Sequence, residues 1–350
     1  MTDDGLGAPR SPRRALWALL LLLPLALAAV LAGRGPASGG RSVVLYTAMA
    51  SEDVARLLPA FEASSGIRAE VVKLGSGDAL QRLAAERERP ACDVIFGVSP
   101  DQLEAHQELF AAYTPAGAAA LDPAFRGGER WTPWSGLVLA LVVNEARLPP
   151  GEPPRGWRDL ADPRFAGKLV QARPDKSGSA YMHLAGALHL LGEEQGWPVV
   201  QAIAAQARQA PGSAAVPRFV ADGEAAVGLT LEDSAWRYVQ GGGGVKLVHP
   251  VEGAPVAADG LALVAGAPHP AEAKAFLEWA LSVEAQTLLA TEVGRRPVRR
   301  DVPGPAGLPT LEQVGAVPYP LAWAVAEQER LLARWRELSA AADSSGAAPR

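Results

Sequence analysis

The sequence contains a single cysteine, Cys92, among its 350 residues. One cysteine excludes an intramolecular disulfide, so the fold must be stabilised by its hydrophobic core. The formal net charge is −5 and there is no long basic run, so nothing indicates a nucleic-acid partner. A Gly-x-Ser-x-Gly nucleophile elbow is missing as well, which weighs against a serine hydrolase.

The N-terminal segment has the pattern of an export signal. Arg10, Arg13 and Arg14 precede an apolar run over residues 15–32 that ends in small residues, as in secretory signals. We therefore expect residues 1–32 to be a signal peptide and the protein to lie in the periplasm. The run is also long enough to stay as an uncleaved inner-membrane anchor. No cysteine follows it closely, which excludes the usual lipid attachment of an exported lipoprotein.

Between two polar segments, apolar strands alternate with amphipathic helices. Residues 33–41 are expected to be a linker and residues 339–350 a disordered tail. The first helix should start at Ser51 and end at Gly66, with Pro59 kinking or shortening it. Such alternation is typical of a mostly parallel α/β sheet with helices on both faces. The expected strands cover residues 42–46, 67–73, 92–96, 136–143, 167–172, 225–230, 245–250 and 260–264.

Polar turns follow the first three expected strands. In open α/β sheets, ligands bind beyond the carboxyl ends of the strands, so these turns are candidate ligand contacts. Each turn taken singly is equally compatible with an ordinary strand-to-helix connection. The residues concerned are Tyr46, Thr47, Ser76, Gly77, Gly97 and Ser99.

The stretch from Gln171 to Leu184 leads from a strand through a polar turn into a helix. Ser177, Gly178 and Ser179 stand where that helix should begin. The start of a helix leaves backbone N–H groups without intrahelical partners, and a glycine with two hydroxyls makes the turn suitable for an anion. The alternative is that Ser177 or Ser179 only caps the helix.

An acidic pair, Glu232 and Asp233, follows the strand that ends at Thr230. The pair can hold an ammonium group or a metal ion. Alternatively, Asp233 caps the next helix while Glu232 is solvated. Together with the turn at Ser177, the pair would suit a zwitterion with a phosphonate at one end and an amine at the other.

Six short motifs occupy residues 157–160, 163–168, 174–180, 222–233, 259–264 and 270–282. Together they resemble the bacterial ABC-transporter solute-binding proteins of the ferric-iron, phosphonate and sugar-phosphate group. The resemblance implies a type II periplasmic binding protein, with two α/β lobes joined by a two-strand hinge and closing on a ligand. Lobe 1 would comprise residues 42–135 and 255–338, and lobe 2 residues 136–254.

By this resemblance, the protein is the substrate-binding component of an ABC importer. It would capture a small anionic solute of the phosphonate or phosphate-ester type and deliver it to a membrane permease. It would act as a monomer, without enzymatic activity, a cofactor or a nucleic-acid partner. The expected ligand contacts are Tyr46, Thr47, Ser76, Gly77, Gly97, Ser99, Ser177, Gly178, Ser179, Thr230, Glu232 and Asp233.

Ferric iron is the main alternative ligand. Iron-binding members of the resembling family commonly place adjacent tyrosines after the strand that matches residues 225–230, where this chain has leucine followed by two acids. Iron would then need Glu232 and Asp233 together with Tyr46 or Tyr181.

Two further hypotheses concern the class of protein. If the apolar N-terminal run is not cleaved, the chain is a membrane-anchored ligand sensor. Lys176 beside Ser177 and Ser179 suggests a serine–lysine nucleophile. Adjacent residues on one turn rarely face each other, however, so binding is favoured over catalysis.

Overall fold

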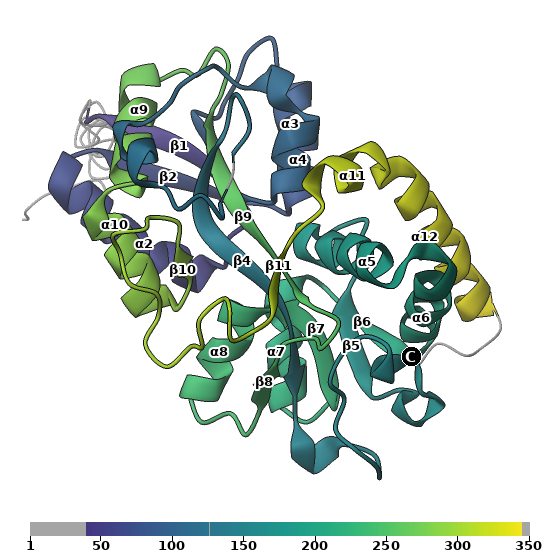
Figure 1. Cartoon of the computed structure of the whole chain (residues 1–350). Helices are drawn as coiled ribbons and strands as arrows, with labels where there is room; N and C mark the ends of the chain where they lie inside the picture. The colour runs from purple at the N-terminus through teal and green to yellow at the C-terminus, as the bar shows by residue number, and fades with distance from the viewer. Residues whose placement is uncertain (1–39, 126, 345–350) are drawn as a thin grey trace, which may run out of the picture. The chain divides into compact units, whose positions relative to one another are not determined.

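Eleven strands of the described residues form one sheet (Figure 1). The computed structural model describes residues 40–125 and 127–344. The main strands follow the order β2-β1-β3-β9-β4-β7-β5-β6, and the short strands β8, β10 and β11 pair with β4 or β9. Their bounds are β1 Ser42–Thr47, β2 Arg68–Lys73, β3 Val94–Val98, β4 Thr132–Val143, β5 Leu169–Ala172, β6 Ala207–Ala210, β7 Val227–Leu231, β8 Lys246–Val248, β9 Ala254–Leu263, β10 Arg296–Pro297 and β11 Ala316–Pro318.

The sheet is parallel at its two ends and antiparallel in its centre. Strand β1 pairs in parallel with β2 and β3, and β5 pairs in parallel with β6 and β7. The two long strands β4 and β9 run antiparallel to each other and to their outer neighbours β7 and β3. We expected a mostly parallel sheet, and this prediction is correct only for the strands at each end. The centre is antiparallel because the chain passes through it twice, in opposite directions.

Helices pack on both ends of the sheet. We call β1–β3 with α2, α3, α4, α9 and α10 the first lobe, and β5–β8 with α5, α6, α7 and α8 the second lobe. The helices are α2 Ser51–Ser65, α3 Ser76–Ala85, α4 Pro100–Ala105, α5 Gly178–Leu191, α6 Glu193–Gln206, α7 Val216–Ala221, α8 Glu232–Gln240, α9 Pro270–Ala280, α10 Val283–Leu288, α11 Leu321–Ala326 and α12 Gln328–Ser344.

Helix α2 shows how local sequence sets the ends of an element. Gly66 ends the helix at φ 66°, a left-handed conformation that glycine adopts without steric cost. The helix keeps all 15 residues, so Pro59 does not shorten it. Val54 and Phe61 are among the buried residues of its apolar face.

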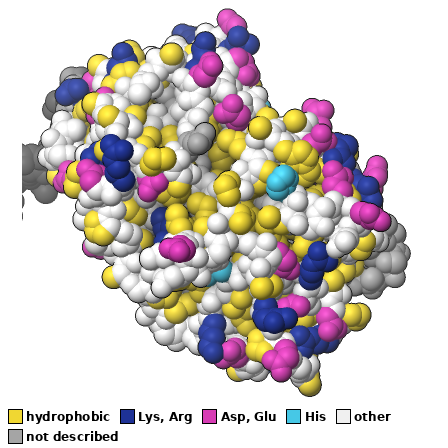
Figure 2. Space-filling view, in the orientation of Figure 1, with side chains coloured by type: hydrophobic (Ala, Val, Ile, Leu, Met, Phe, Trp, Pro, Cys, Tyr) yellow, Lys and Arg dark blue, Asp and Glu magenta, His cyan; other side chains and the backbone are white. Residues whose placement is uncertain are grey.

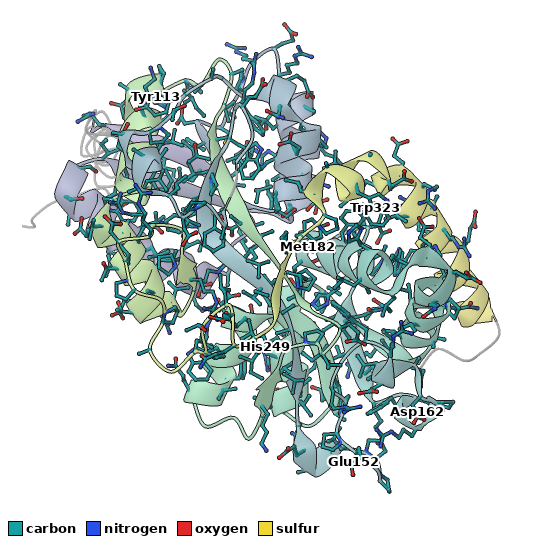
Figure 3. All side chains as sticks on the ribbon, in the orientation of Figure 1. Tyr113, Glu152, Asp162, Met182, His249 and Trp323 are labelled. Carbon is teal, nitrogen blue, oxygen red and sulfur yellow. The ribbon has the colours of Figure 1, made fainter. Side chains whose placement is uncertain are left out.

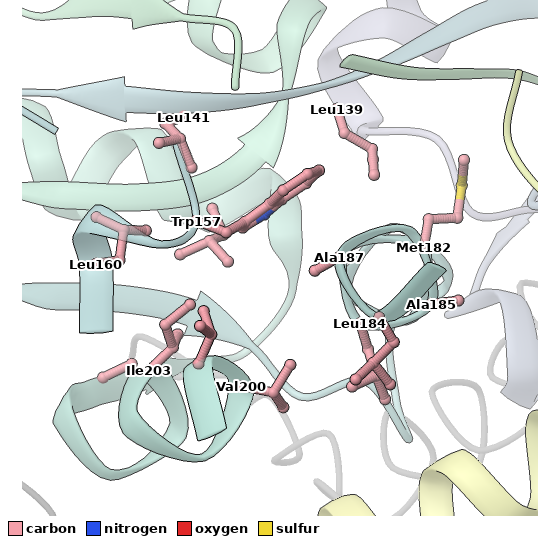
Figure 4. Close-up of a cluster of buried hydrophobic side chains, with 14 of the residues drawn as sticks. Leu139, Leu141, Trp157, Leu160, Met182, Leu184, Ala185, Ala187, Val200 and Ile203 are labelled. Carbon is pink, nitrogen blue, oxygen red and sulfur yellow. The ribbon is translucent and has the colours of Figure 1, made fainter. Parts of the chain in front are cut away.

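Each lobe has its own apolar core. In the first lobe, Phe96 packs against Trp134 and Phe276, with ring centroids 4.8 and 5.0 Å apart. In the second lobe, Trp157 and Met182 belong to a cluster that fills the space around α5 and α6 (Figure 4). Burying a large apolar side chain contributes about 1.5–3 kcal/mol, so these cores stabilise the two lobes.

The C-terminal helix departs from the expected layout. Residues 321–338 were expected with lobe 1, but α12 packs on α6, and Leu331 and Trp335 are buried in the second-lobe core. Helix α11 meanwhile contacts α4 of the first lobe. Leu331 and Trp335 lie four positions apart and so share one helix face, and burying that face decides where α12 lies.

The two ends of the chain lie largely outside the described residues. This holds for the expected signal peptide at 1–32, for most of the linker at 33–41 and for the last part of the tail. Within the described part of the tail, α12 continues to Ser344, so the expected disorder at 339–344 is wrong. None of the helices in residues 40–125 and 127–344 combines the length and apolar character that crossing a membrane requires. On the face drawn in Figure 2, Lys and Arg are interspersed with Asp and Glu.

Candidate functional site

A cleft with a volume of about 580 Å³ lies where the carboxyl ends of strands from both lobes meet. This volume falls within the usual range for small-molecule sites. Most of the lining side chains are small or polar, and none is aromatic. The lining residues are Ala48, Ala50, Asp53, Lys73, Leu74, Gly75, Ser76, Asp78, Gly97, Ser99, Leu137, Lys176, Ser177, Gly178, Ser179, Pro211, Gly212, Ser213, Ala214, Leu231, Ser234, Asp259 and Arg295.

Two helices of different lobes begin at this cleft. Helix α3 starts at Ser76 after the N-cap Gly75, and α5 starts at Gly178 after the N-cap Ser177. The turn before α5 is in direct contact with two turns of the first lobe, because a Cβ atom added to Gly178 would lie 2.3 Å from Oγ of Ser99, the N-cap of α4, and 3.2 Å from Oγ of Ser76 in α3. The free N–H groups and the positive dipole ends of both helices therefore face one volume, an arrangement that favours an anion.

Three hydroxyl groups gather at the start of α5. Ser179 Oγ lies 2.5 Å from Ser213 Oγ, and Ser177 Oγ lies 3.3 Å from both of these oxygens. Ser177 Oγ also accepts a long hydrogen bond of 3.5 Å from the N–H of Ala180. The same serine thus caps the helix and lines the cleft, so the two interpretations of this turn are compatible.

Ser213 is a cleft residue that the sequence did not point out. It follows Pro211 and Gly212, directly after β6 ends at Ala210. A small polar turn at the carboxyl end of a strand was the signal available. It was missed because the strand at 207–210 was not predicted.

Six of the expected ligand contacts line the cleft and six do not. The six that line it are Ser76, Gly97, Ser99, Ser177, Gly178 and Ser179; the six that do not are Tyr46, Thr47, Gly77, Thr230, Glu232 and Asp233. Tyr46 is fully buried and its hydroxyl donates to the Glu86 carboxylate at 2.8 Å, and burial with this contact raises its pKa well above the ordinary value. Thr47 Oγ1 accepts from the N–H of Met49, and Thr230 Oγ1 donates to the Ser213 carbonyl. These side chains complete local hydrogen bonds instead of facing a ligand.

The acidic pair forms buried ion pairs with two arginines at the start of β10. Arg295 Nε lies 2.7 Å from Asp233 Oδ2, and Arg296 Nε lies 2.7 Å from Glu232 Oε2. His249, which is labelled in Figure 3, lies with its Nε2 atom 2.7 Å from the other oxygen of Glu232. The expected roles of a solvated acid and a helix cap are therefore wrong. No local sequence pattern indicates that Arg295 and Arg296 are the partners of these two acids.

The ion pairs of α8 connect the two lobes. Arg237 of α8 reaches α2 of the first lobe, where its Nη2 lies 2.6 Å from Asp53 Oδ1. Burial by itself would raise the pKa of Glu232, but hydrogen bonds from His249 and Arg296 lower it below the ordinary value. These contacts hold the lobes together on one side of the cleft.

The residues of the iron hypothesis are not assembled. Tyr46 and Tyr181 are buried in different cores, and the Tyr181 hydroxyl donates to the carbonyl of Ala324. Glu232 and Asp233 are occupied by arginines. Among the described residues, no group of three or more His, Cys, Asp or Glu side chains is placed to hold a metal ion.

The family of bacterial extracellular solute-binding proteins matches residues 43–292. The chain belongs to this family. Among the curated relatives of this solute-binding protein, one from Sinorhizobium fredii is named as an ABC transporter periplasmic-binding protein. It is 26% identical over 251 residues, which cover 67% of this chain and 68% of the relative. A Salmonella paratyphi A relative, named for 2-aminoethylphosphonate binding, is 26% identical over 261 residues, which cover 69% of this chain and 73% of the relative.

Solved structures show the same fold. The periplasmic binding protein AfuA from Actinobacillus pleuropneumoniae, with fructose-6-phosphate bound, matches with a TM-score of 0.81 at 23% identity, over 86% of this chain and 98% of that chain. Iron-bound HitA from Pseudomonas aeruginosa matches with a TM-score of 0.75 at 21% identity, over 85% of this chain and 99% of that chain. The expected two-lobe architecture of a periplasmic solute-binding protein is thereby confirmed. Apart from the C-terminal helix, the expected residue boundaries of the lobes stay a prediction.

Proposed function

We propose that this solute-binding protein serves an ABC importer and captures a small anionic solute of the phosphonate or phosphate-ester type. The observation that carries the proposal is the meeting of two helix starts with the hydroxyls of Ser177, Ser179 and Ser213 in one cleft. A phosphonate or phosphate presents several oxygens, which suits many converging donors. The Salmonella relative is named for a phosphonate, and AfuA was solved with a sugar phosphate bound; both support the same ligand class.

In this proposal the protein acts in the periplasm and hands its solute to a membrane permease. It acts as a monomer and leaves the solute chemically unchanged. The family supports a role in binding, and the N-terminal apolar run supports export. The contact between the lobes at Gly178 supports a cleft that closes around its ligand, because bound ligand shifts such proteins towards the closed state.

Ferric iron is the second candidate, since a Serratia marcescens relative named Fe(3+)-binding periplasmic protein is 26% identical over 272 residues. The cleft gives iron little support, because none of its lining residues is a tyrosine. Of the three acids that line it, Asp53 and Asp259 already accept from Arg237 and Arg295, which leaves Asp78. The anionic solute is therefore favoured.

Thermal unfolding of the mature protein with added ligands tests this choice. Ethylphosphonate or a sugar phosphate should raise the melting temperature, since a ligand at a hundred times its Kd stabilises the folded state by about 2.7 kcal/mol. Ferric citrate should leave the melting temperature unchanged, and phosphorus NMR should show the phosphonate unaltered after incubation. Stabilisation by ferric citrate alone, or conversion of the phosphonate, would overturn the proposal.

Gly178→Ala should weaken binding of ethylphosphonate roughly fivefold to a hundredfold. The added Cβ would lie 2.6 Å from Ser99 Cβ, an atom fixed close to the backbone. The turns at Gly178 and Ser99 must then move apart, and overpacking of this kind costs about 1–3 kcal/mol. Isothermal titration calorimetry would measure the loss.

Gly77→Ala is the matched control, because a Cβ added at Gly77 meets no atom within 4 Å. Its affinity should equal that of the unmodified protein. Equal affinities of the two variants would show that ligand binding does not need the contact between the turns.

A further inference from the structure

The C-terminal helices α11 and α12, which we call the C-terminal strap, are anchored on the second lobe. The hydroxyl of Tyr181 in α5 donates to the carbonyl of Ala324 in α11. Arg330 of α12 forms an ion pair of 2.6 Å with Glu193 at the start of α6. Trp335 of α12 is buried in the second-lobe core. The strap therefore moves together with the second lobe.

The C-terminal strap also contacts the first lobe. Helix α11 packs beside α4 (Figure 1), and Leu321 at its start is packed against apolar clusters of both lobes. At the start of α12, Gln328 Nε2 donates to Asp101 Oδ2 of α4 at 3.2 Å. The same oxygen accepts more weakly from Gln102 of α4, at 3.4 Å. The strap thus joins the lobes at a place separate from the strands β4 and β9 that connect them.

The contact at Asp101 belongs to the interface that separates when the cleft opens. Asp101 is the second residue of α4 and is fully buried. Ser99, the N-cap of the same helix, lines the cleft and contacts Gly178 of the second lobe. Because both residues belong to one short helix, moving Ser99 away from Gly178 also moves Asp101 away from Gln328. The hydrogen bond is therefore made only while the lobes are in contact.

We infer that the C-terminal strap is a latch that holds α4 against the second lobe and keeps the lobes together even without a ligand. Leu321 forms its apolar part and Gln328 its polar part. A larger fraction of closed ligand-free molecules raises the apparent affinity in proportion. The charge of Asp101 acts against the latch, because burial raises the pKa of its carboxyl to about 6 and so disfavours the ionised form.

Gln328→Ala should open the ligand-free protein. Without the amide, Asp101 loses its donor from the strap in the closed arrangement, whereas water solvates the carboxylate once the lobes separate. Small-angle X-ray scattering should show a larger radius of gyration than that of the unmodified protein. Calorimetry should show ethylphosphonate binding roughly fivefold to a hundredfold more weakly, the usual effect of leaving a buried acceptor without its partner. An unchanged or smaller radius of gyration would overturn the latch.

Gln107→Ala is the matched control. Gln107 follows α4, donates to Glu104 of that helix at 2.7 Å and does not line the cleft. This substitution also removes a glutamine that donates to a carboxylate, but both partners lie on the first lobe. Its radius of gyration and its affinity should equal those of the unmodified protein.

Asp101→Asn should have the opposite effect to Gln328→Ala. The asparagine carbonyl oxygen can still accept from Gln328, and the closed arrangement no longer buries a charge. The ligand-free protein should have a smaller radius of gyration, and ethylphosphonate should bind about tenfold more tightly. An Asp101→Asn protein that opens would overturn the role given to the charge. If none of these proteins binds ethylphosphonate, the proposed anion site is overturned, while scattering on the ligand-free proteins still decides the latch.

Discussion

Replacing Ser177 and Ser179 together by alanine should weaken the binding of ethylphosphonate by roughly two to four orders of magnitude. Both hydroxyls lie in the cleft beside Ser213, at the start of α5. A hydrogen bond to a charged group contributes about 1.5–3 kcal/mol, and 1.4 kcal/mol corresponds to a factor of ten in affinity. Calorimetry on the double variant measures the effect directly.

The double variant should also lose stability, because Ser177 caps α5. Loss of such a cap costs about 0.5–2 kcal/mol. Ser282→Ala separates the two effects, since Ser282 caps α10 through a 3.1 Å hydrogen bond from Ala285 and lies outside the cleft. The control should melt at a lower temperature with unchanged affinity. The same behaviour in the double variant would mean that the turn at Ser177 is only structural.

Arg295→Met should lower the free energy of unfolding by about 3–5 kcal/mol, the usual effect of removing one partner from a buried ion pair. Arg295 is 6% exposed and contacts Asp233 at 2.7 Å and Asp259 at 2.6 Å. Without the guanidinium, both carboxylates stay buried without their main cation. Urea denaturation at neutral pH, followed by circular dichroism, measures the difference.

Arg218→Met is the control for this change. Arg218 pairs with Asp222 on the surface, where the two side chains are 75% and 50% exposed. Exposed pairs contribute about 0–1 kcal/mol, so the control should unfold nearly as the unmodified protein does. A loss at Arg295 as small as that at Arg218 would show that the buried carboxylates do not depend on the arginine.

Much of the site could be predicted because its parts are local. The turn from Ser177 to Ser179 lies between a strand and a helix that are both visible in the periodicity of the sequence. A helix start exposes its N–H groups wherever the helix lies in the fold. The ends of α2 were likewise visible, because Gly66 suits the left-handed conformation that stops a helix. The resemblance to solute-binding proteins then supplied the two-lobe layout.

The sequence by itself thus determined the family, the alternation of strands and helices, and the serine-rich turn that begins α5. Only the tertiary structure decided which side chains line the cleft and which form ion pairs or hydrogen bonds elsewhere. Arg237 and Asp53 lie 184 positions apart, and Arg295 meets Asp233 across 62 positions. No local pattern records such pairs, because ion pairs depend on where whole elements pack. For that reason the sequence indicated Glu232 and Asp233 as ligands, whereas the fold pairs both of them with arginines.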